Sequence, residues 1–391
     1  MPAPIVLRNL SPAPKKVSNP PSGEPIIATR EDLRDGSRGI ITNPAPQGVI
    51  FTESFDDQPD WHSGLPENDT GESPAGLPDR VQRAATHTFI SDWYSCYQDP
   101  RFSPSMGFPN RREAISILAA DSDKARGGVG KCYVGSRDSY DAGWNNWNSD
   151  SSLVRYLPQG YDQLYVEFWL KFSPDWITET GGSKIFRIAS WNGQVSEYDY
   201  FGGGNGGPIL LWFWEASSYG IRNKLGFRGG PHGDNYGMTN DRVDGFPRPL
   251  GGSGDLPMNW TNDMVGMAPG GATPQVPDKV NGGFISDDLN QNVTHDQVFG
   301  SDYNKFAFFV KMNSAPGVKD GVCKQWFNDE RVFSNEQIAW VGPTDQSMPK
   351  WNDVAIGGND FFRARPNDEA YQDWYAIDDI VCRADVPEGL E

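Results

Sequence analysis

The sequence QLYVEFWLKF, residues 163–172, alternates between two kinds of side chain at every second position. A period of two places successive side chains on opposite faces of an extended segment. One face is aliphatic or Phe and the other is aromatic or charged: Leu164, Val166, Phe168, Leu170 and Phe172 on the first, and Tyr165, Glu167, Trp169 and Lys171 on the second. The segment is therefore predicted to be a β-strand with two different faces.

Segments of the same character recur along the chain between turns rich in Gly, Pro and Asn, and no convincing amphipathic helix lies between them. They are SKIFRIASW (183–191), PILLWFWEA (208–216), NKLGFRG (223–229), KFAFFVKM (305–312), VCKQWFNDERVF (322–333) and WYAIDDIVCR (374–383). Long strands joined by turns predict an all-β protein, either a two-sheet antiparallel sandwich or a jelly roll.

Three regions differ in composition. Residues 1–48 are rich in proline and have neither a helical nor a strand period, so we expect an extended N-terminal arm that contacts another subunit or the outside of its own domain. The strand pattern over residues 49–391 predicts one large jelly-roll domain. Within it, residues 229–300 are rich in Gly and Pro and are predicted to be a long insertion, of the kind that is usually functional, contact-making or disordered.

The net charge of the chain excludes some classes of binding partner. Lys and Arg number 34 against 52 Asp and Glu, for a formal net charge of −18, and such a surface repels a phosphate backbone. Nucleic acid is therefore not an expected partner. The longest apolar run, residues 209–214, is far shorter than the roughly 20 residues of a membrane span. Because the N-terminal residues lack the pattern of a secretory signal, we expect cytoplasmic synthesis and no membrane partner.

An ordered set of motifs runs along the domain: LYVEFWLKFSPDW, GGSKIFRIASW, KFAFFVKMN, DGVCKQWFNDERVF and YAIDDIVC. The set resembles the concanavalin A-like lectin/glucanase superfamily, in particular its polysaccharide-lyase-like branch. A strand pair of the form DG…W-x-N…[VF] is common in that branch, and its places are taken here by Asp320, Gly321, Trp326, Asn328 and Phe333. The resemblance implies a concanavalin A-like jelly roll in which FTESFDD (51–57) and YAIDDIV (375–381) are antiparallel neighbours.

Both of these terminal strands carry paired aspartates. Some members of the superfamily hold calcium near these termini, so the resemblance makes Asp56, Asp57 and Asp379 candidate Ca²⁺ ligands. The alternative is a structural role, in which an aspartate at the strand edge accepts hydrogen bonds from a neighbouring loop. No cofactor is required by either interpretation.

The lyase branch needs a group that neutralises a uronate carboxylate, together with a base and an acid. If the protein is a lyase, the candidates are Lys184, Arg187 and Arg228 on strands, with His232 and Tyr236 in the Gly-rich segment beyond them. Arg222 and Lys224 would extend these cations into a basic strip for an acidic polymer. A surface His near a Tyr is otherwise most often unrelated to catalysis.

Tryptophan is abundant, with 14 residues in the chain. Sugar rings stack on indoles, so Trp169, Trp212 and Trp214 are candidate glycan-binding residues. The alternative is that alternating tryptophans fill the space between the two sheets.

These observations leave three functions. We expect a virion-type structural or surface assembly protein, located in a virion or cell-surface assembly, whose lectin-like jelly roll binds glycans and whose arm contacts other subunits. The alternative is a polysaccharide lyase that cleaves an acidic polysaccharide by β-elimination. The third is a non-catalytic carbohydrate-binding module.

Overall fold

The structure is a computed structural model, and it describes residues 48–58, 61–62, 88–90, 93–96, 114–117, 123–138, 151–174, 176, 181–191, 206–217, 220–230, 237–246, 249–251, 253–258, 276–277, 284–285, 295–345, 347–358 and 372–390. The chain divides into two compact units, Met1–Gly48 and Val49–Glu391. Apart from Gly48, the predicted arm and its subunit contacts lie outside the described residues.

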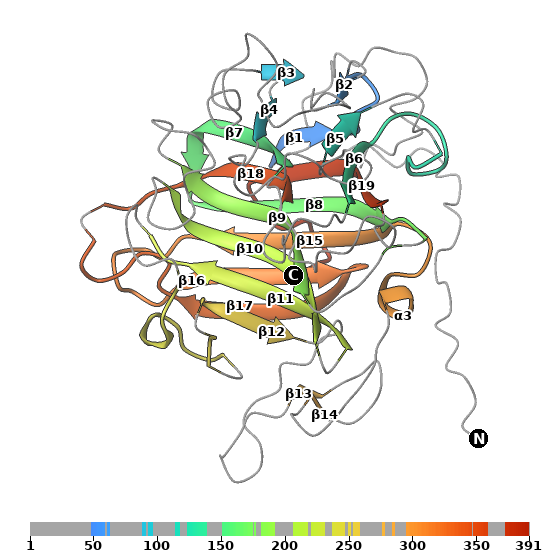
Figure 1. The fold of residues 1–391 in the computed structure, drawn as a ribbon. Coiled ribbons are helices and arrows are strands. Elements are labelled where there is room, and N and C mark those ends of the chain that lie inside the picture. Colours follow the sequence, from blue (N-terminus) through green and yellow to red (C-terminus); the bar gives the residue numbers. More distant parts are fainter. Residues whose placement is uncertain are drawn as a thin grey trace, which may run out of the picture. The chain divides into compact units, whose positions relative to one another are not determined.

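The second unit is built from two antiparallel sheets, as predicted (Figure 1). In sheet A the strands follow the order β17 (Glu330–Ile338), β16 (Gly321–Phe327), β15 (Asn304–Lys311), β8 (Gln163–Phe172), β19 (Gln372–Arg383), β6 (Tyr133–Asp138), β5 (Ala114–Ile117) and β2 (Trp61–His62), with β1 (Val49–Glu53) paired to β19.

In sheet B the order is β12 (Asp255–Met258), β11 (Gly220–Arg228), β10 (Gly206–Ser217), β9 (Gly181–Trp191), β18 (Trp351–Gly358), β7 (Ser151–Tyr161), β4 (Trp93–Cys96) and β3 (Thr88–Ile90). The smaller elements are the hairpin β13 (Val276–Pro277) and β14 (Phe284–Ile285), the 3₁₀ turn η3 (Asn240–Arg242) and the short helix α3 (His295–Phe299). This architecture is a two-sheet antiparallel β-sandwich, as predicted.

The core lies between the two sheets, and β8 shows how the sequence forms it. Leu164, Phe168 and Leu170 of β8 are fully buried and pack against core residues of sheet B such as Phe186 and Trp212. The alternate residues Tyr165, Glu167 and Trp169 lie on the other side, the outer face of sheet A. The predicted two-faced strand is therefore confirmed.

The first and last strands are neighbours, which confirms the expected closure of the domain. β1 runs antiparallel to β19, with Val49 opposite Arg383 and Glu53 opposite Ile380. Glu53 also links this pair to sheet B, because its carboxylate accepts a hydrogen bond from Trp93 Nε1 of β4 at 3.0 Å. The same carboxylate accepts a local hydrogen bond from Phe55 N at 2.6 Å.

The DG…W-x-N…F motif forms the hairpin of β16 and β17. Its tip, Asn328 and Asp329, has positive φ values of 50° and 66°, a conformation that Asn and Asp tolerate better than most residues. Gly321 is required for packing, since a Cβ there would lie 2.5 Å from the carbonyl oxygen of Ile338. The motif thus specifies a turn and a close strand contact.

The predicted insertion near 229–300 contributes to the domain in the parts that the structure describes. Strand β12 pairs with β11 at the edge of sheet B, and Leu256 of β12 is buried in the core. Helix α3 places His295 and Phe299 in an aromatic cluster with Phe172 and Trp214. The segment is therefore partly structural.

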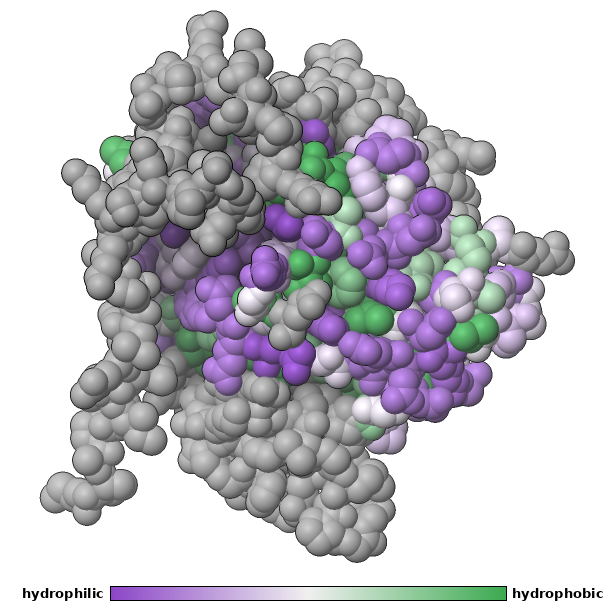
Figure 2. All heavy atoms as spheres, turned by 180° about the vertical axis from the view of Figure 1, so that it is seen from behind, coloured by the Kyte–Doolittle hydropathy of each residue, from purple (hydrophilic) through white to green (hydrophobic). Residues whose placement is uncertain are grey.

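The described surface offers few apolar side chains. Val129 and Val318 are the large hydrophobic residues that are exposed among the residues described. On the face turned away in Figure 1, the described residues that are visible are mainly hydrophilic, with small separate hydrophobic spots (Figure 2). No helix in the described part of the chain has the length and apolar character to cross a membrane.

Candidate functional site

Strand β10 carries apolar side chains on both of its faces. Leu210, Trp212 and Trp214 turn into the core between the sheets, whereas Ile209, Leu211 and Phe213 form a separate cluster on the opposite side, the outer face of sheet B. Trp212 and Trp214 are only 0% and 2% exposed. Their burial leaves no ring face for a sugar, so the glycan-binding prediction is wrong for these two residues.

Cations flank the apolar residues of β10 on both sides. On β9, Lys184 lies opposite Phe213 and Arg187 opposite Leu211; on β11, Lys224 lies opposite Phe213 and Arg228 opposite Ile209. Because strand partners point to the same side of a sheet, all four side chains share the outer face of sheet B. We call Lys184, Arg187, Lys224 and Arg228 the cationic face.

A register shift in β9 sets the position of Lys184. The shift lies where Trp212 and Phe213 of β10 meet β9, so Ile185 and Phe186 both contribute to the core and Lys184 pairs with Phe213. A bulge of this kind re-aims the side chains beside it. Lys184 is thereby brought to the same face as Arg187, although an unbroken alternation would place the two on opposite faces.

Arg187 is the most enclosed cation of this face. Its side chain is 0% exposed, and its Nη1 donates a hydrogen bond to the carbonyl oxygen of Gly357 on β18 at 3.0 Å. Lys184 and Arg228 are also buried. Charges in a site closed to water interact more strongly with an opposite charge than they would at the surface.

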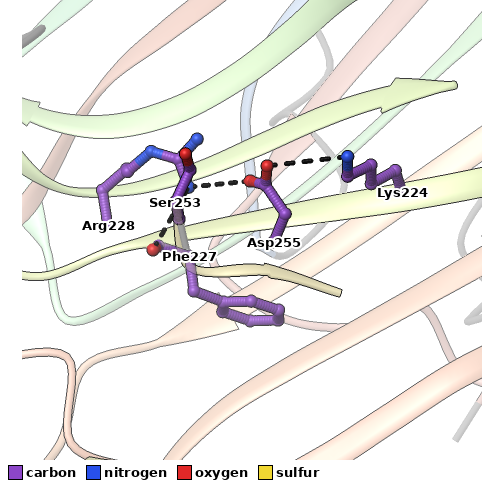
Figure 3. Close-up of polar contacts among 5 residues, drawn as sticks. All are labelled: Lys224, Phe227, Arg228, Ser253 and Asp255. Atoms are coloured by element: carbon purple, nitrogen blue, oxygen red, sulfur yellow. Dashed lines mark hydrogen bonds and ion pairs between the residues drawn. The ribbon is translucent and has the colours of Figure 1, made fainter. Parts of the chain in front are cut away.

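At the β11 end of the cationic face, an acidic residue lies beside the two cations (Figure 3). Arg228 Nη1 lies 3.0 Å from Asp255 Oδ1, and Lys224 Nζ lies 3.7 Å from Asp255 Oδ2. Lys224 Nζ also lies 4.9 Å from the ring centroid of Phe213. In the close-up, Phe227 projects to the opposite side of the strand, consistent with its place in the core.

Three residues of this face were not found from the sequence. Tyr156 on β7 is half-buried and pairs with Asp353 on β18, which in turn pairs with Ala189 on β9. The ring of Tyr156 contacts Trp191 edge to face, with 4.8 Å between the ring centroids. Trp191 and Arg187 are four positions apart in β9, so the alternation of a strand places both on the same face. This spacing is the sequence signal that could have identified Trp191.

The structure therefore brings together the described members of the predicted lyase set. Lys184, Arg187 and Arg228 lie on one face of sheet B, and their convergence on one groove stays a prediction. His232 and Tyr236 lie outside the described residues, so their convergence with Arg187 stays a prediction.

Trp169 lies on the outer face of sheet A, away from the cationic face. The guanidinium of Arg126 covers its ring at 3.8 Å from the centroid. This is a cation–π contact, and it occupies the position in which a sugar ring would stack. Glycan binding by Trp169 stays a prediction.

The predicted calcium ligands take part in protein contacts. Asp379 forms an ion pair with Arg126 Nη1 at 2.6 Å, Asp56 Oδ1 accepts a hydrogen bond from Lys131 N at 2.7 Å, and Asp57 is exposed. The described residues contain no group of three or more His, Cys, Asp or Glu side chains that could hold a metal ion. The calcium site stays a prediction.

Asp56, just after β1, and the aspartate pair of β19 instead hold one loop, residues 123–131. Asp378 is fully buried, and its Oδ2 accepts a hydrogen bond from Arg126 N at 2.8 Å. A register shift after Asp378 and a φ of +48° at Asp379 aim the second carboxylate at the same arginine. This contact is the structural alternative expected from the sequence.

Comparisons with known proteins add the following. No protein-family model and no curated protein matches the chain. Among solved structures, an alginate lyase from Aplysia kurodai is similar at 12% identity and a TM-score of 0.39, with 78% of this chain and 96% of that chain covered. An endo-β-1,4-glucuronan lyase from Trichoderma reesei matches at 11% identity and a TM-score of 0.38, with 70% and 87% covered.

An alginate lyase from a Chlorella virus also matches, at 12% identity and a TM-score of 0.33, with 64% of this chain and 85% of that chain covered. These identities and TM-scores describe a similar arrangement of strands. They assign no function to individual residues of this chain. The matches are mostly polysaccharide lyases, so the expectation of a virion-type structural protein is contradicted, and the alternative of a lyase fits them better.

Proposed function

We propose that the protein is a polysaccharide lyase that cleaves an acidic polysaccharide by β-elimination. The observation that carries the proposal is the cationic face, which gathers Lys184, Arg187, Lys224 and Arg228 around an apolar strand in a chain of net charge −18. A local concentration of positive charge in so acidic a protein favours an anionic ligand at this face.

The arrangement suits a uronate polymer through its charges. The cations that flank the buried apolar column of Ile209, Leu211 and Phe213 can receive carboxylates, for which the arginine fork is well shaped. Arg187 is closed to solvent, whereas the side chain of Lys224 is 16% exposed. The polymer would therefore reach the face from the edge formed by β11 and β12.

The reaction assigns separate tasks to these residues. A cation paired with the uronate carboxylate stabilises the negative charge that develops when the C5 proton leaves. A base takes that proton, the C–H electron pair forms the C4–C5 double bond, and the C4–O bond breaks with its oxygen receiving a proton. Tyr156 and Lys184 are the described candidates for base and acid, and His232 and Tyr236 remain the candidates from the sequence.

The test is the ultraviolet absorbance of the unsaturated product when the purified protein is mixed with alginate or polyglucuronate. We expect Arg228→Gln to lower kcat/KM about 100-fold, the effect of losing one charge-stabilising group. Lys319→Gln is the matched control, because Lys319 forms an ion pair with Asp244 elsewhere in the chain. A flat absorbance with every polyuronate tested would contradict the proposal.

A second candidate is a non-catalytic carbohydrate-binding protein. The half-buried ring of Tyr156, which contacts Trp191 on the same face, favours it, because the accessible part of an aromatic ring can stack a sugar without any reaction. Binding without absorbance change, lost on Tyr156→Ala, would establish this function in place of the lyase.

A further inference from the structure

The carboxylate of Asp255 lies between two cations of the cationic face. Its Oδ1 is 3.0 Å from Arg228 Nη1, and its Oδ2 is 3.7 Å from Lys224 Nζ (Figure 3). One carboxylate thus contacts, with its two oxygens, the two groups that would otherwise receive a carboxylate of the ligand.

A glycine makes room for this contact. Strands β11 and β12 place Gly226 opposite Asp255, between Lys224 and Arg228 along β11. A Cβ at Gly226 would lie 3.0 Å from Arg228 Nη1 and 3.0 Å from Asp255 Oδ1, tighter than most contacts of this kind. The absence of a side chain therefore lets the ion pair lie flat on the outer face.

Arg228 is also held by groups other than Asp255. Its Nη1 donates to the carbonyl oxygens of Phe227, at 3.4 Å, and of Ser253. These backbone acceptors would keep the guanidinium in place if the carboxylate of Asp255 moved or were neutralised. Asp255 is therefore not the sole anchor of Arg228.

Solvent reaches this end of the face. The side chains of Lys224 and Asp255 are each 16% exposed, whereas Arg187 is fully enclosed. An incoming anion can thus contact Lys224 and compete with Asp255 without crossing the buried part of the face. Exchange of one carboxylate for another also avoids leaving buried cations without an opposite charge.

We infer that Asp255 is a built-in counter-ion, which occupies the carboxylate-binding position of Arg228 and Lys224 and is displaced by a uronate of the substrate. The inference rests on the proposed function. On this inference Asp255 influences the affinity for the substrate through its contacts with Arg228 and Lys224. In the free protein its carboxylate neutralises part of the positive charge at the solvent-accessible end of the cationic face.

The test compares Asp255→Asn with the wild type in binding to polyglucuronate by isothermal titration over a series of salt concentrations. The amide keeps the shape but not the charge, so we expect about tenfold tighter binding and a steeper loss of affinity with salt. Asp244→Asn is the matched control, since Asp244 is an exposed partner of Lys319 and its neutralisation changes the net charge equally.

Weaker or unchanged binding by Asp255→Asn would overturn the inference, because a residue that only positions the cations would lose affinity on substitution. Equal tightening by Asp244→Asn would overturn it as well, since net charge alone would then suffice. If Asp255→Asn does not fold, Asp255→Ser removes the same charge with a smaller side chain and is held to the same expectation.

Failure of the proposed function gives a different result. If neither the wild type nor Asp255→Asn binds any polyuronate, both the proposed function and the counter-ion role of Asp255 are wrong. If the wild type binds and Asp255→Asn binds no tighter, only the counter-ion role of Asp255 is wrong.

Discussion

Asn223 of sheet B and Gln325 of sheet A form a closed amide pair inside the core. Asn223 Nδ2 donates to Gln325 Oε1 at 2.7 Å, and Gln325 Nε2 donates back to Asn223 Oδ1 at 3.2 Å. Trp212 Nε1 donates to the same Asn223 oxygen at 2.9 Å. Both amides are 0% exposed, so the two sheets are joined by polar contacts as well as by apolar packing.

We expect Asn223→Ala to lower the free energy of unfolding by about 3 kcal/mol, because it leaves the Gln325 amide and the indole N–H buried without this partner. Urea denaturation measures the loss. Replacing both residues, Asn223→Leu with Gln325→Met, should cost less than the sum of the single changes, since no amide then lacks its partner. Additive losses would contradict the pair.

The two kinds of tryptophan should respond differently to truncation. Trp212→Ala removes a fully buried indole and should cost about 3–5 kcal/mol of unfolding free energy. Trp169→Ala, on the outer face of sheet A, should cost much less. Thermal unfolding of both variants checks this order, and equal losses would place Trp169 in a core that the structure does not show.

The loop of residues 123–131 should depend on the terminal aspartates and not on calcium. Asp379→Asn removes the charge that pairs with Arg126, so hydrogen exchange of this loop should become faster. Addition of a chelator should leave the melting temperature unchanged. A melting temperature that falls on chelation and returns with Ca²⁺ would instead support the calcium prediction.

Lys305 should contribute stability that is lost in alkali. Burial acts to lower the pKa of Lys305, but the carboxylates of Glu167 and Asp329, at 3.1 and 3.0 Å, outweigh it, so the pKa lies above its ordinary value of 10.5. A raised pKa in the folded state means that the stabilisation is complete below about pH 10.5 and disappears as the pH rises through the folded value.

We therefore expect Lys305→Met to lower the unfolding free energy by about 2 kcal/mol at pH 8, with the difference from the wild type shrinking above about pH 10.5. Lys311→Met, on an exposed position of the same strand, is the control. A difference that grows with pH would show that the ion pairs are not the cause.

The sequence allowed the fold to be predicted where alternation was unambiguous. In β8 one face was aliphatic or Phe and the other polar or aromatic, so the core side was clear, and the pairing of β1 with β19 followed from the superfamily resemblance. In β10 both faces are apolar, because Ile209, Leu211 and Phe213 are buried as well. Alternation could not tell which face was the core, and Trp212 and Trp214 were misplaced.

The candidate site was predicted in part for similar reasons. Arg187 and Arg228 stand on regular strands and could be assigned to one face, but Lys184 reaches that face only through the register shift in β9. Asp255 follows a stretch rich in Gly and Pro, and its position depends on pairing with β11. After such a stretch, the pairing register of β12 against β11 depends on tertiary packing, which cannot be predicted from a single sequence.

The pairing of Val49 with Arg383 also determines how the domain would respond to mechanical force. The chain enters β1 and leaves β19 at the same end of one antiparallel pair. Tension applied through these two points would load the hydrogen bonds between the strands one after another, as in opening a zipper, instead of shearing them together. A single-molecule pulling experiment with handles at positions 49 and 383 should therefore open the domain at low force, beginning at this pair.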